Sequence, residues 1–311
     1  MINYSVIIPA YNIENYIDKL NNFIKNIKNN RNDVEFIIIN DGSTDNTKLK
    51  LNILAEEIIY LEQENKGVSS ARNLGLQIAT GDWILFLDSD DEFSLKIFDI
   101  LDFTDNKKEL ILFNYKINTS IVNKDLVSGI YSNSFLLNRF LTKKNNFSIC
   151  CFCYKKDFLL KNNLFFKDGY KLGEDIHFLL RALLFSSKIN YINKVLFIYN
   201  LHTGSAVNSK ITHNKLMILD LYNTIDELFI ELKKEEYLNF IYFKSWTYLY
   251  LIKKIVKFGL DDDLITHIYK YKKNIINQLK QTPYLSKKIL HIFLIKSFTL
   301  YITLLNKNEQ K

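Results

Sequence analysis

Residues 83–91 read Trp-Ile-Leu-Phe-Leu-Asp-Ser-Asp-Asp, an apolar run that stops at three carboxylates within four residues. An apolar run without alternation is typical of a strand buried on both faces of a parallel sheet. Open α/β sheets bind their ligands at the carboxyl ends of such strands. Carboxylates this close raise one another's pKa unless a cation or a hydrogen-bond donor lies between them. The stretch therefore indicates either a divalent metal site or an acidic turn, since Asp is also common in turns.

The composition describes a folded protein of moderate size. The chain has 311 residues, of which 48% are hydrophobic and 14% aromatic. These values exclude a disordered protein and allow one large domain with a smaller one. With only two prolines and nine glycines, the sequence carries few sharp boundaries.

The three cysteines lie together at Cys150, Cys151 and Cys153. A metal or redox site is one interpretation, but no second group of Cys or His residues completes a tetrahedral shell. Burial of small apolar side chains in a strand is the interpretation that we favour. The odd number of thiols, and a start that enters a strand without a signal sequence, favour the reducing cytosol.

The first part of the chain alternates strands and helices. Apolar runs predict strands at 4–9, 34–39, 58–61 and 83–87, and helical spacing predicts helices at 14–27 and around 71–79. Another short helix is expected to end near Lys50, capped by Ser43 or Thr44. The pattern predicts an α/β fold with a doubly wound parallel sheet.

Three predicted strands end in polar loops, at residues 9–12, 40–45 and 88–91. Because parallel strands end at one edge, these loops should form one crevice holding Tyr11, Asp41, Asp88 and Asp90. An aromatic ring can stack on a base, a carboxylate can accept a pyrimidine imide hydrogen, and paired acids can hold a metal on a diphosphate. The Gly-rich fingerprints of dinucleotide-binding and P-loop proteins are absent.

Several segments together resemble the successive motifs of family 2 glycosyltransferases, which have the GT-A fold. The segments are residues 5–12, 40–47, 65–75 and 86–91, with further similarity at 173–178 and 199–205. The resemblance implies a Rossmann-like, mostly parallel sheet flanked by helices. One departure is Asn40, which stands where the motif commonly has a first acid.

The resemblance also implies roles for individual residues. Tyr11 and Asp41 would contact uracil, and Asp88 would approach the ribose and the metal. Asp175 resembles the catalytic base of an inverting enzyme and follows Glu174 in the acidic first turn of a predicted helix. The full set of implied site residues is Pro9, Tyr11, Asp41, Arg72, Asp88 and Glu174 for substrate, Asp175 for catalysis, and Asp88, Asp90 and His202 for Mg²⁺ or Mn²⁺. A structural role is the alternative for His202.

From about residue 211 the pattern changes to long helices. We expect a catalytic domain over 1–210 and a helical region over 211–311. Residues 244–296 contain eleven lysines against three aspartates, a charge of +8, while the whole chain carries +7. Interleaved with aromatic residues, this charge suits an anionic membrane surface, or else a solvated lysine face. The apolar stretch at 289–305 is short and contains His and Lys, so we expect it to be interfacial or packed.

These observations predict a metal-dependent inverting glycosyltransferase. Its donor would be a UDP-sugar, and its acceptor a glycan or lipid-linked glycan such as a capsule or lipooligosaccharide precursor. It would be cytoplasmic and peripheral on the inner face of a bacterial membrane. The basic charge alone leaves open a non-catalytic nucleotide- or nucleic-acid-binding protein. No nucleic-acid-binding motif is present, however, and we expect no nucleic acid as a partner. A nucleotidyltransferase is a third possibility, but its Gly-rich loop is absent.

Overall fold

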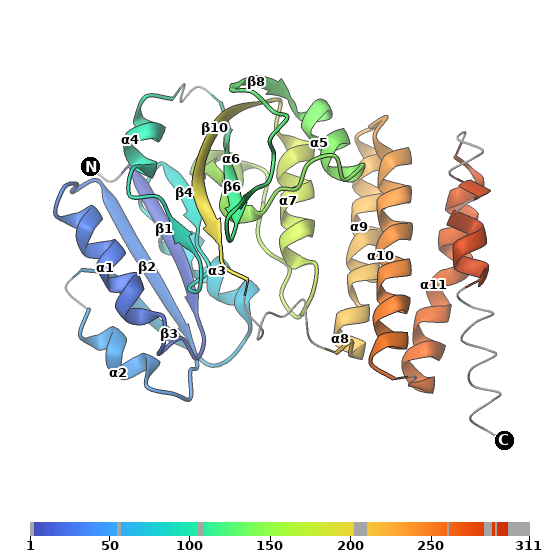
Figure 1. The fold of residues 1–311 in the computed structure, drawn as a ribbon, viewed down its shortest axis with the longest axis horizontal. Coiled ribbons are helices and arrows are strands. Elements are labelled where there is room, and N and C mark those ends of the chain that lie inside the picture. The colour runs from blue at the N-terminus through green and yellow to red at the C-terminus, as the bar shows by residue number, and fades with distance from the viewer. Residues whose placement is uncertain are drawn as a thin grey trace. The chain divides into compact units, whose positions relative to one another are not determined.

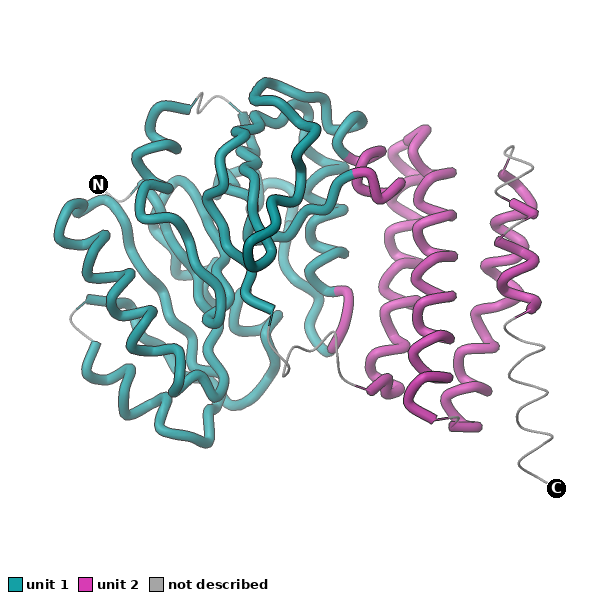
Figure 2. Tube along the Cα trace, in the orientation of Figure 1, with its two compact units in different colours: residues 1–136, 145–169, 174–202 teal, residues 137–144, 170–173, 203–311 magenta. Residues whose placement is uncertain are grey.

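The computed structural model describes residues 3–54, 57–104, 108–201, 210–259, 261–282, 288–289 and 291–297. The chain divides into two compact units, coloured separately in Figure 2. Unit 1 comprises residues 1–136, 145–169 and 174–202, and unit 2 comprises residues 137–144, 170–173 and 203–311. The domain division at residue 210 that the sequence suggested stays a prediction.

Unit 1 is built on one large sheet (Figure 1). Its main strands lie in the order β3-β2-β1-β4-β9-β6-β10-β5, with β7 paired to β6 and β8 to β10. The bounds are β1 Tyr4–Ala10, β2 Val34–Asp41, β3 Ile59–Gln63, β4 Trp83–Phe86, β5 Glu92–Phe93, β6 Leu110–Ile117, β7 Ser120–Ile121, β8 Gly129–Ser132, β9 Phe152–Lys155 and β10 Lys188–Tyr199. Strands β1 to β4 run parallel, which confirms the predicted doubly wound half.

The second half of the sheet departs from a purely parallel arrangement. Strand β9 pairs antiparallel with both β4 and β6, whereas β6 and β10 are parallel. The short strands β5, β7 and β8 also pair antiparallel with their neighbours. The longest ladders, β1–β2 and β6–β10, are parallel, so most of the paired residues are in parallel register, as the GT-A resemblance implied. Cys153 lies in β9, and Cys150 and Cys151 lie in the 3₁₀ turn before it. All three thiols are buried, and burial raises their pKa values.

The helices of unit 1 cover the sheet. Their bounds are α1 Ile17–Lys28, α2 Thr47–Asn52, α3 Val68–Ile78, α4 Ile97–Asp102, α6 Lys156–Lys161 and α7 Glu174–Phe185, while α5 Asn133–Leu141 crosses from one unit to the other. Helix α3 packs on β1 and β2, and this contact depends on Gly75. A Cβ atom there would lie 2.4 Å from Cγ2 of the buried Ile7.

The predicted cap of α2 is wrong. Neither Ser43 nor Thr44 caps this helix, because their hydroxyls are engaged with Asn12. The helix begins later, at Thr47, whose N–H donates to Asp45 Oδ1 (2.9 Å). The two hydroxyl residues instead tie the loop after β2 to the loop after β1.

Unit 2 is helical over its described residues. Its elements are α8 His213–Leu216, α9 Ile218–Glu231, α10 Tyr237–Lys257 and α11 Asp262–Lys280, and residues 291–297 are also helical. Helix α9 buries an apolar face that includes Leu221 and Ile225. In the part of the chain that the structure describes, every helix is too short or too polar to cross a lipid bilayer.

Candidate active site

The polar loops of unit 1 gather at one edge of the sheet, as predicted. Parallel register pairs Pro9 with Ile39 and Ile7 with Phe86, so the segments that follow β1, β2 and β4 leave the sheet side by side. Asn12 joins two of these segments, since its N–H donates to Ser43 Oγ (3.0 Å) and its Oδ1 accepts from Thr44 N (2.8 Å). Pro9 is buried within β1, and Tyr11 is 48% exposed.

Asp41 ends β2 and is almost fully buried. Its Oδ1 accepts hydrogen bonds from Gln63 Nε2 (2.7 Å) and Lys66 N (2.8 Å), and its Oδ2 accepts from Gly67 N (2.9 Å). Gly67 has a φ of +93°, a conformation that glycine adopts without strain. Asp41 therefore fixes the loop that starts α3, a role that the sequence did not reveal.

Arg72 is the centre of the site. This buried α3 residue donates from Nη2 to Asp88 Oδ1 (2.6 Å), and its Nη1 lies 4.0 Å from Glu174 Oε1. Its guanidinium carbon lies 5.1 Å from the centre of the Phe166 ring. Burial disfavours the charge, but the carboxylates of Asp88 and Glu174 outweigh it and raise the pKa of Arg72. The Nε and Nη1 atoms are buried without a hydrogen-bond partner in the described chain, so the guanidinium has unused donors.

Arg72 also brings the predicted base close to the acidic strand end. Glu174 and Asp175 form the first turn of α7. Burial and the adjacent Asp175 raise the pKa of Glu174 to about 7, against the opposing charge of Arg72. Burial raises the pKa of Asp175 as well, although its Oδ1 accepts from Ile176 N (2.7 Å). A carboxylate with a raised pKa is a stronger base than an exposed one.

The segment after β4 is anchored to the end of β10. The amide N–H of Asn200 donates to Asp91 Oδ1 (2.8 Å), and its side chain donates to the Asp90 carbonyl oxygen (3.0 Å). Burial and the charges of Asp88 and Asp90 raise the pKa of Asp91 to about 8. Asp91 and Asn200 were not among the predicted site residues. The predicted metal ligand His202 lies outside the described residues.

The donor set of this segment fits a divalent metal ion that shares its ligands with a substrate. Within the described ranges, no three His, Cys, Asp or Glu side chains are placed to hold a metal by themselves. Asp88 and Asp90 nevertheless supply two hard carboxylates on one turn, and Asp88 remains 36% exposed. Mg²⁺ is commonly held by one or two carboxylates together with substrate phosphates and water.

A hydrophobic cluster supports the site from beneath. Phe86, at the end of β4, contacts Tyr154, Phe166 and Phe178 edge to face, with ring centroids 5.1–5.6 Å apart. Phe166 and Phe178 stack at 4.1 Å. Phe166 thus links the core to Arg72, and its position in a loop gave no signal in the sequence beyond its aromatic character.

Comparison with known proteins identifies the class. Residues 5–162 match the model of glycosyl transferase family 2, and the chain belongs to this family. The glycosyltransferase GlyA of Streptococcus pneumoniae is 32% identical over 219 residues, which are 65% of this chain and 31% of GlyA. The chain therefore spans about a third of the length of that relative.

One further relative and two solved structures are informative. The poly(ribitol-phosphate) β-N-acetylglucosaminyltransferase TarS of Staphylococcus aureus is 28% identical over 64% of this chain and 35% of TarS. Residues 1–349 of TarS with UDP-GlcNAc superpose with a TM-score of 0.75, at 19% identity over 96% of this chain and 90% of that one. A mannosyltransferase of Pyrobaculum calidifontis, solved with GDP-mannose and Mn²⁺, gives a TM-score of 0.55 at 15% identity, over 96% and 87% of the two chains. These similarities confirm the GT-A fold.

Proposed function

We propose that the chain is an inverting, metal-dependent glycosyltransferase that moves a sugar from a UDP-sugar to a hydroxyl of a growing surface glycan. The observation that carries the proposal is the set of contacts around Arg72, which joins the acidic strand end at Asp88 to Glu174, next to Asp175. Family membership gives the reaction class. The name of TarS and its UDP-GlcNAc complex favour a UDP-sugar donor and a surface-polymer acceptor.

The donor would bind along the sheet edge. Tyr11, exposed beside Pro9, would stack on the uracil, and Asp41 would accept its imide hydrogen with a remaining lone pair. The unused donors of Arg72 would bind the diphosphate, because a guanidinium matches phosphate oxygens in geometry and charge. Asp88 would bind the ribose as well as the metal.

The chemical step needs a base and a stabilised leaving group. Asp175 would take the proton of the acceptor hydroxyl while that oxygen attacks the anomeric carbon. The bond from this carbon to the diphosphate oxygen breaks on the opposite face, and UDP leaves with the electron pair. This single displacement inverts the anomeric configuration and forms no covalent enzyme intermediate. Mg²⁺ or Mn²⁺ held by Asp88 and Asp90 would supply charge stabilisation for the departing diphosphate.

Unit 2 provides a candidate surface for the acceptor's membrane. On and around α10, lysines pair with exposed aromatic rings: Lys143 with Trp246, and Lys254 with Tyr250 and Phe258. Such amphipathic side chains suit an anionic bilayer interface. Co-sedimentation with phosphatidylglycerol vesicles would test this, and binding equal to that on phosphatidylcholine vesicles would contradict it.

A donor screen tests the proposed reaction. UDP-Gal, UDP-Glc, UDP-GlcNAc and UDP-GalNAc are each incubated with the protein and mixed glycan acceptors, with MnCl₂ or with EDTA, and released UDP is measured. We expect metal-dependent release from one donor. The matched control is the variant Asp88→Asn, which should lose the release. Silence from all four donors, with no UDP binding by calorimetry, would contradict the proposal.

A further inference from the structure

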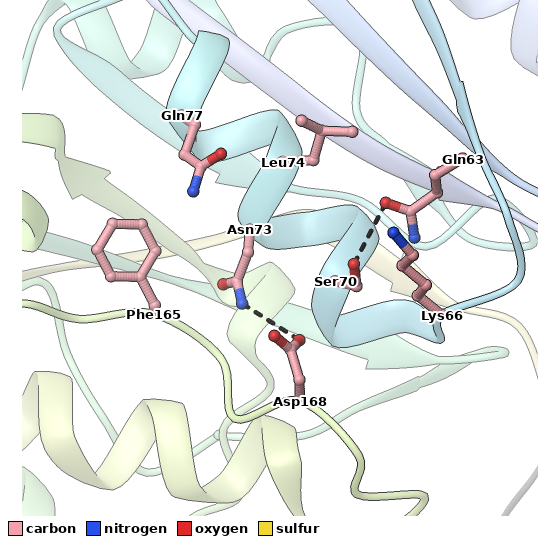
Figure 3. Close-up of a pocket in the computed structure, with 8 residues that line it drawn as sticks. All are labelled: Gln63, Lys66, Ser70, Asn73, Leu74, Gln77, Phe165 and Asp168. Carbon is pink, nitrogen blue, oxygen red and sulfur yellow. Dashed lines mark hydrogen bonds between the residues drawn. The ribbon is translucent and has the colours of Figure 1, made fainter.

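A cavity of about 400 Å³ lies beside α3. None of the residues proposed to bind the donor lines it, although Gln63 in its lining contacts Asp41. Its helical wall consists of Ser70, Asn73, Leu74 and Gln77, whose spacing puts them on one face of α3 (Figure 3). By the 3.6-residue period of the helix, Arg72 falls on the opposite face. The volume is within the range of small-molecule sites.

The opposite wall is a loop that the fold holds rigidly. This loop contributes Phe165 and Asp168 to the cavity. The Asn73 side chain fixes it through two hydrogen bonds, from Nδ2 to the Phe166 carbonyl oxygen (2.9 Å) and from Phe166 N to Oδ1 (2.8 Å). The stacking of Phe166 on Phe178 holds the loop from the other side. The cavity is therefore preformed, and a ligand would not have to order it.

The lining combines hydrogen-bonding groups with a small apolar surface. Gln77 offers an amide, Ser70 a hydroxyl and Asp168 a carboxylate, while Leu74 and Phe165 offer apolar contact. Lys66 is the cationic group of this lining, and the charge of Asp168 offsets it. A neutral ligand with many hydroxyls and an apolar ring face matches this chemistry. A diphosphate would need a net positive lining.

We infer that this cavity is a subsite for a neutral sugar residue of the acceptor glycan. The inference rests on the proposed function and extends it, because it assigns acceptor recognition to side chains that are not among those proposed to bind the donor. The loop that forms the opposite wall, with Phe165 and Asp168, also carries Phe166, whose ring lies under Arg72. The subsite and the reaction site therefore share one rigid element. Along the chain, this loop is followed by α7, whose first turn contains Asp175.

Gln63 marks the boundary between the two sites. Its Nε2 donates to Asp41, and its Oε1 accepts from Ser70 Oγ (3.3 Å). A nucleoside is therefore the competing occupant of the cavity, and the experiment must separate a sugar from a nucleotide.

The test is an NMR titration of the full chain with maltotriose, cellotriose and chitotriose. We expect at least one trisaccharide to bind, and its affinity to be unchanged by saturating UDP with MnCl₂. The variants Gln77→Ala and Phe165→Ala should each weaken binding about fivefold, the effect of one lost hydrogen bond or packing contact. Asn52→Ala and Phe103→Ala, which remove an exposed amide and an exposed ring elsewhere in unit 1, serve as controls and should bind like the original chain.

Three results would overturn the inference: binding of none of the trisaccharides, an affinity in both cavity variants equal to that of the original chain, or displacement of the sugar by UDP. The last would assign the cavity to the nucleotide. The titration requires no turnover, so a failed donor screen leaves its result readable. Sugar binding with a failed donor screen would contradict the proposed reaction and leave the carbohydrate subsite standing.

Discussion

The two units each contain an ion pair with a buried cation, and the pairs differ in what surrounds them. In unit 1, Arg72 is 5% exposed and its partner Asp88 is 36% exposed. In unit 2, Lys244 on α10 pairs with Asp226 on α9, and the two side chains are 2% and 9% exposed. Asn223 and Gln278 contact the Lys244–Asp226 pair, and in the described chain Asp226 Oδ1 has no hydrogen-bond partner. Arg72, beside the more exposed Asp88, has two buried donors, Nε and Nη1, that also make no hydrogen bond within the described residues.

This difference separates a pair that can receive a ligand from a pair that orders helices. In an enclosed pair, both ions lose their hydration, and this desolvation offsets much of their attraction. The main effect of such a pair is to favour one arrangement of α9, α10 and α11. An open pair with unused guanidinium donors can exchange part of its contacts for a phosphate. The predictions below test this division, beginning with the largest effect.

The largest effect is expected from Asp175→Asn. Removing the base should lower the turnover number for transfer about 1,000-fold, within the range of general base catalysis, and leave UDP affinity nearly unchanged. The control is Asp157→Asn, which changes an exposed acid in the first turn of α6. Full transfer activity in the Asp175 variant would remove this residue from the mechanism.

Breaking the enclosed pair should affect stability. Lys244→Met leaves Asp226 buried without its cation and should lower the free energy of unfolding by about 3 kcal/mol. Urea unfolding can be followed by Trp246 fluorescence in a Trp83→Phe background, since the chain has two tryptophans, one in each unit. Lys253→Met, exposed on the same helix, is the matched control. An equal loss in the two variants would show that the pair has no special role.

Changing the open pair should affect binding. Arg72→Lys keeps the charge but loses the fork of donors, so UDP affinity measured by calorimetry with MnCl₂ should fall about 30-fold, or ~2 kcal/mol. Arg31→Lys is the control, because Arg31 pairs with Asp33 and Asp102 away from the site. An unchanged UDP affinity would mean that the unused donors of Arg72 do not meet the nucleotide.

A smaller effect is expected from pH. The pKa of Glu174 is about 7 in the folded chain against an ordinary value of 4.5, so the folded state holds more protons between these values. The free energy of unfolding without ligand should therefore fall as pH rises from 4.5 to 7. The slope of urea midpoints against pH should be shallower in Glu174→Gln. Identical slopes would indicate that Glu174 titrates normally.

The sequence predicted the parallel half of the sheet because β1, β2 and β4 are apolar runs. Such runs identify buried strands from the local sequence alone, without information from distant segments. It also predicted which loops share an edge, since parallel strands end together. It predicted a buried strand at the cysteines but not its antiparallel place between β4 and β6, because this place depends on pairing between distant segments. The contacts of Asp41 with Gln63 and Gly67 and the position of Phe166 under Arg72 are likewise set by tertiary packing.

The predicted cap of α2 was wrong for a related reason. Ser43 and Thr44 are good capping residues in isolation, but Asn12 from another loop takes their hydrogen-bonding groups. Long-range pairing overrode the local preference.

The contact of Gly75 with Ile7 also limits how such a chain can diverge. Both positions are sealed in the interior, so a side chain at 75 can be accommodated only if residue 7 becomes smaller at the same time. A descendant that changed one position alone would have to shift α3, and Arg72 with it. Substitution at this pair is therefore expected to occur jointly or not at all, even though neither residue touches a substrate.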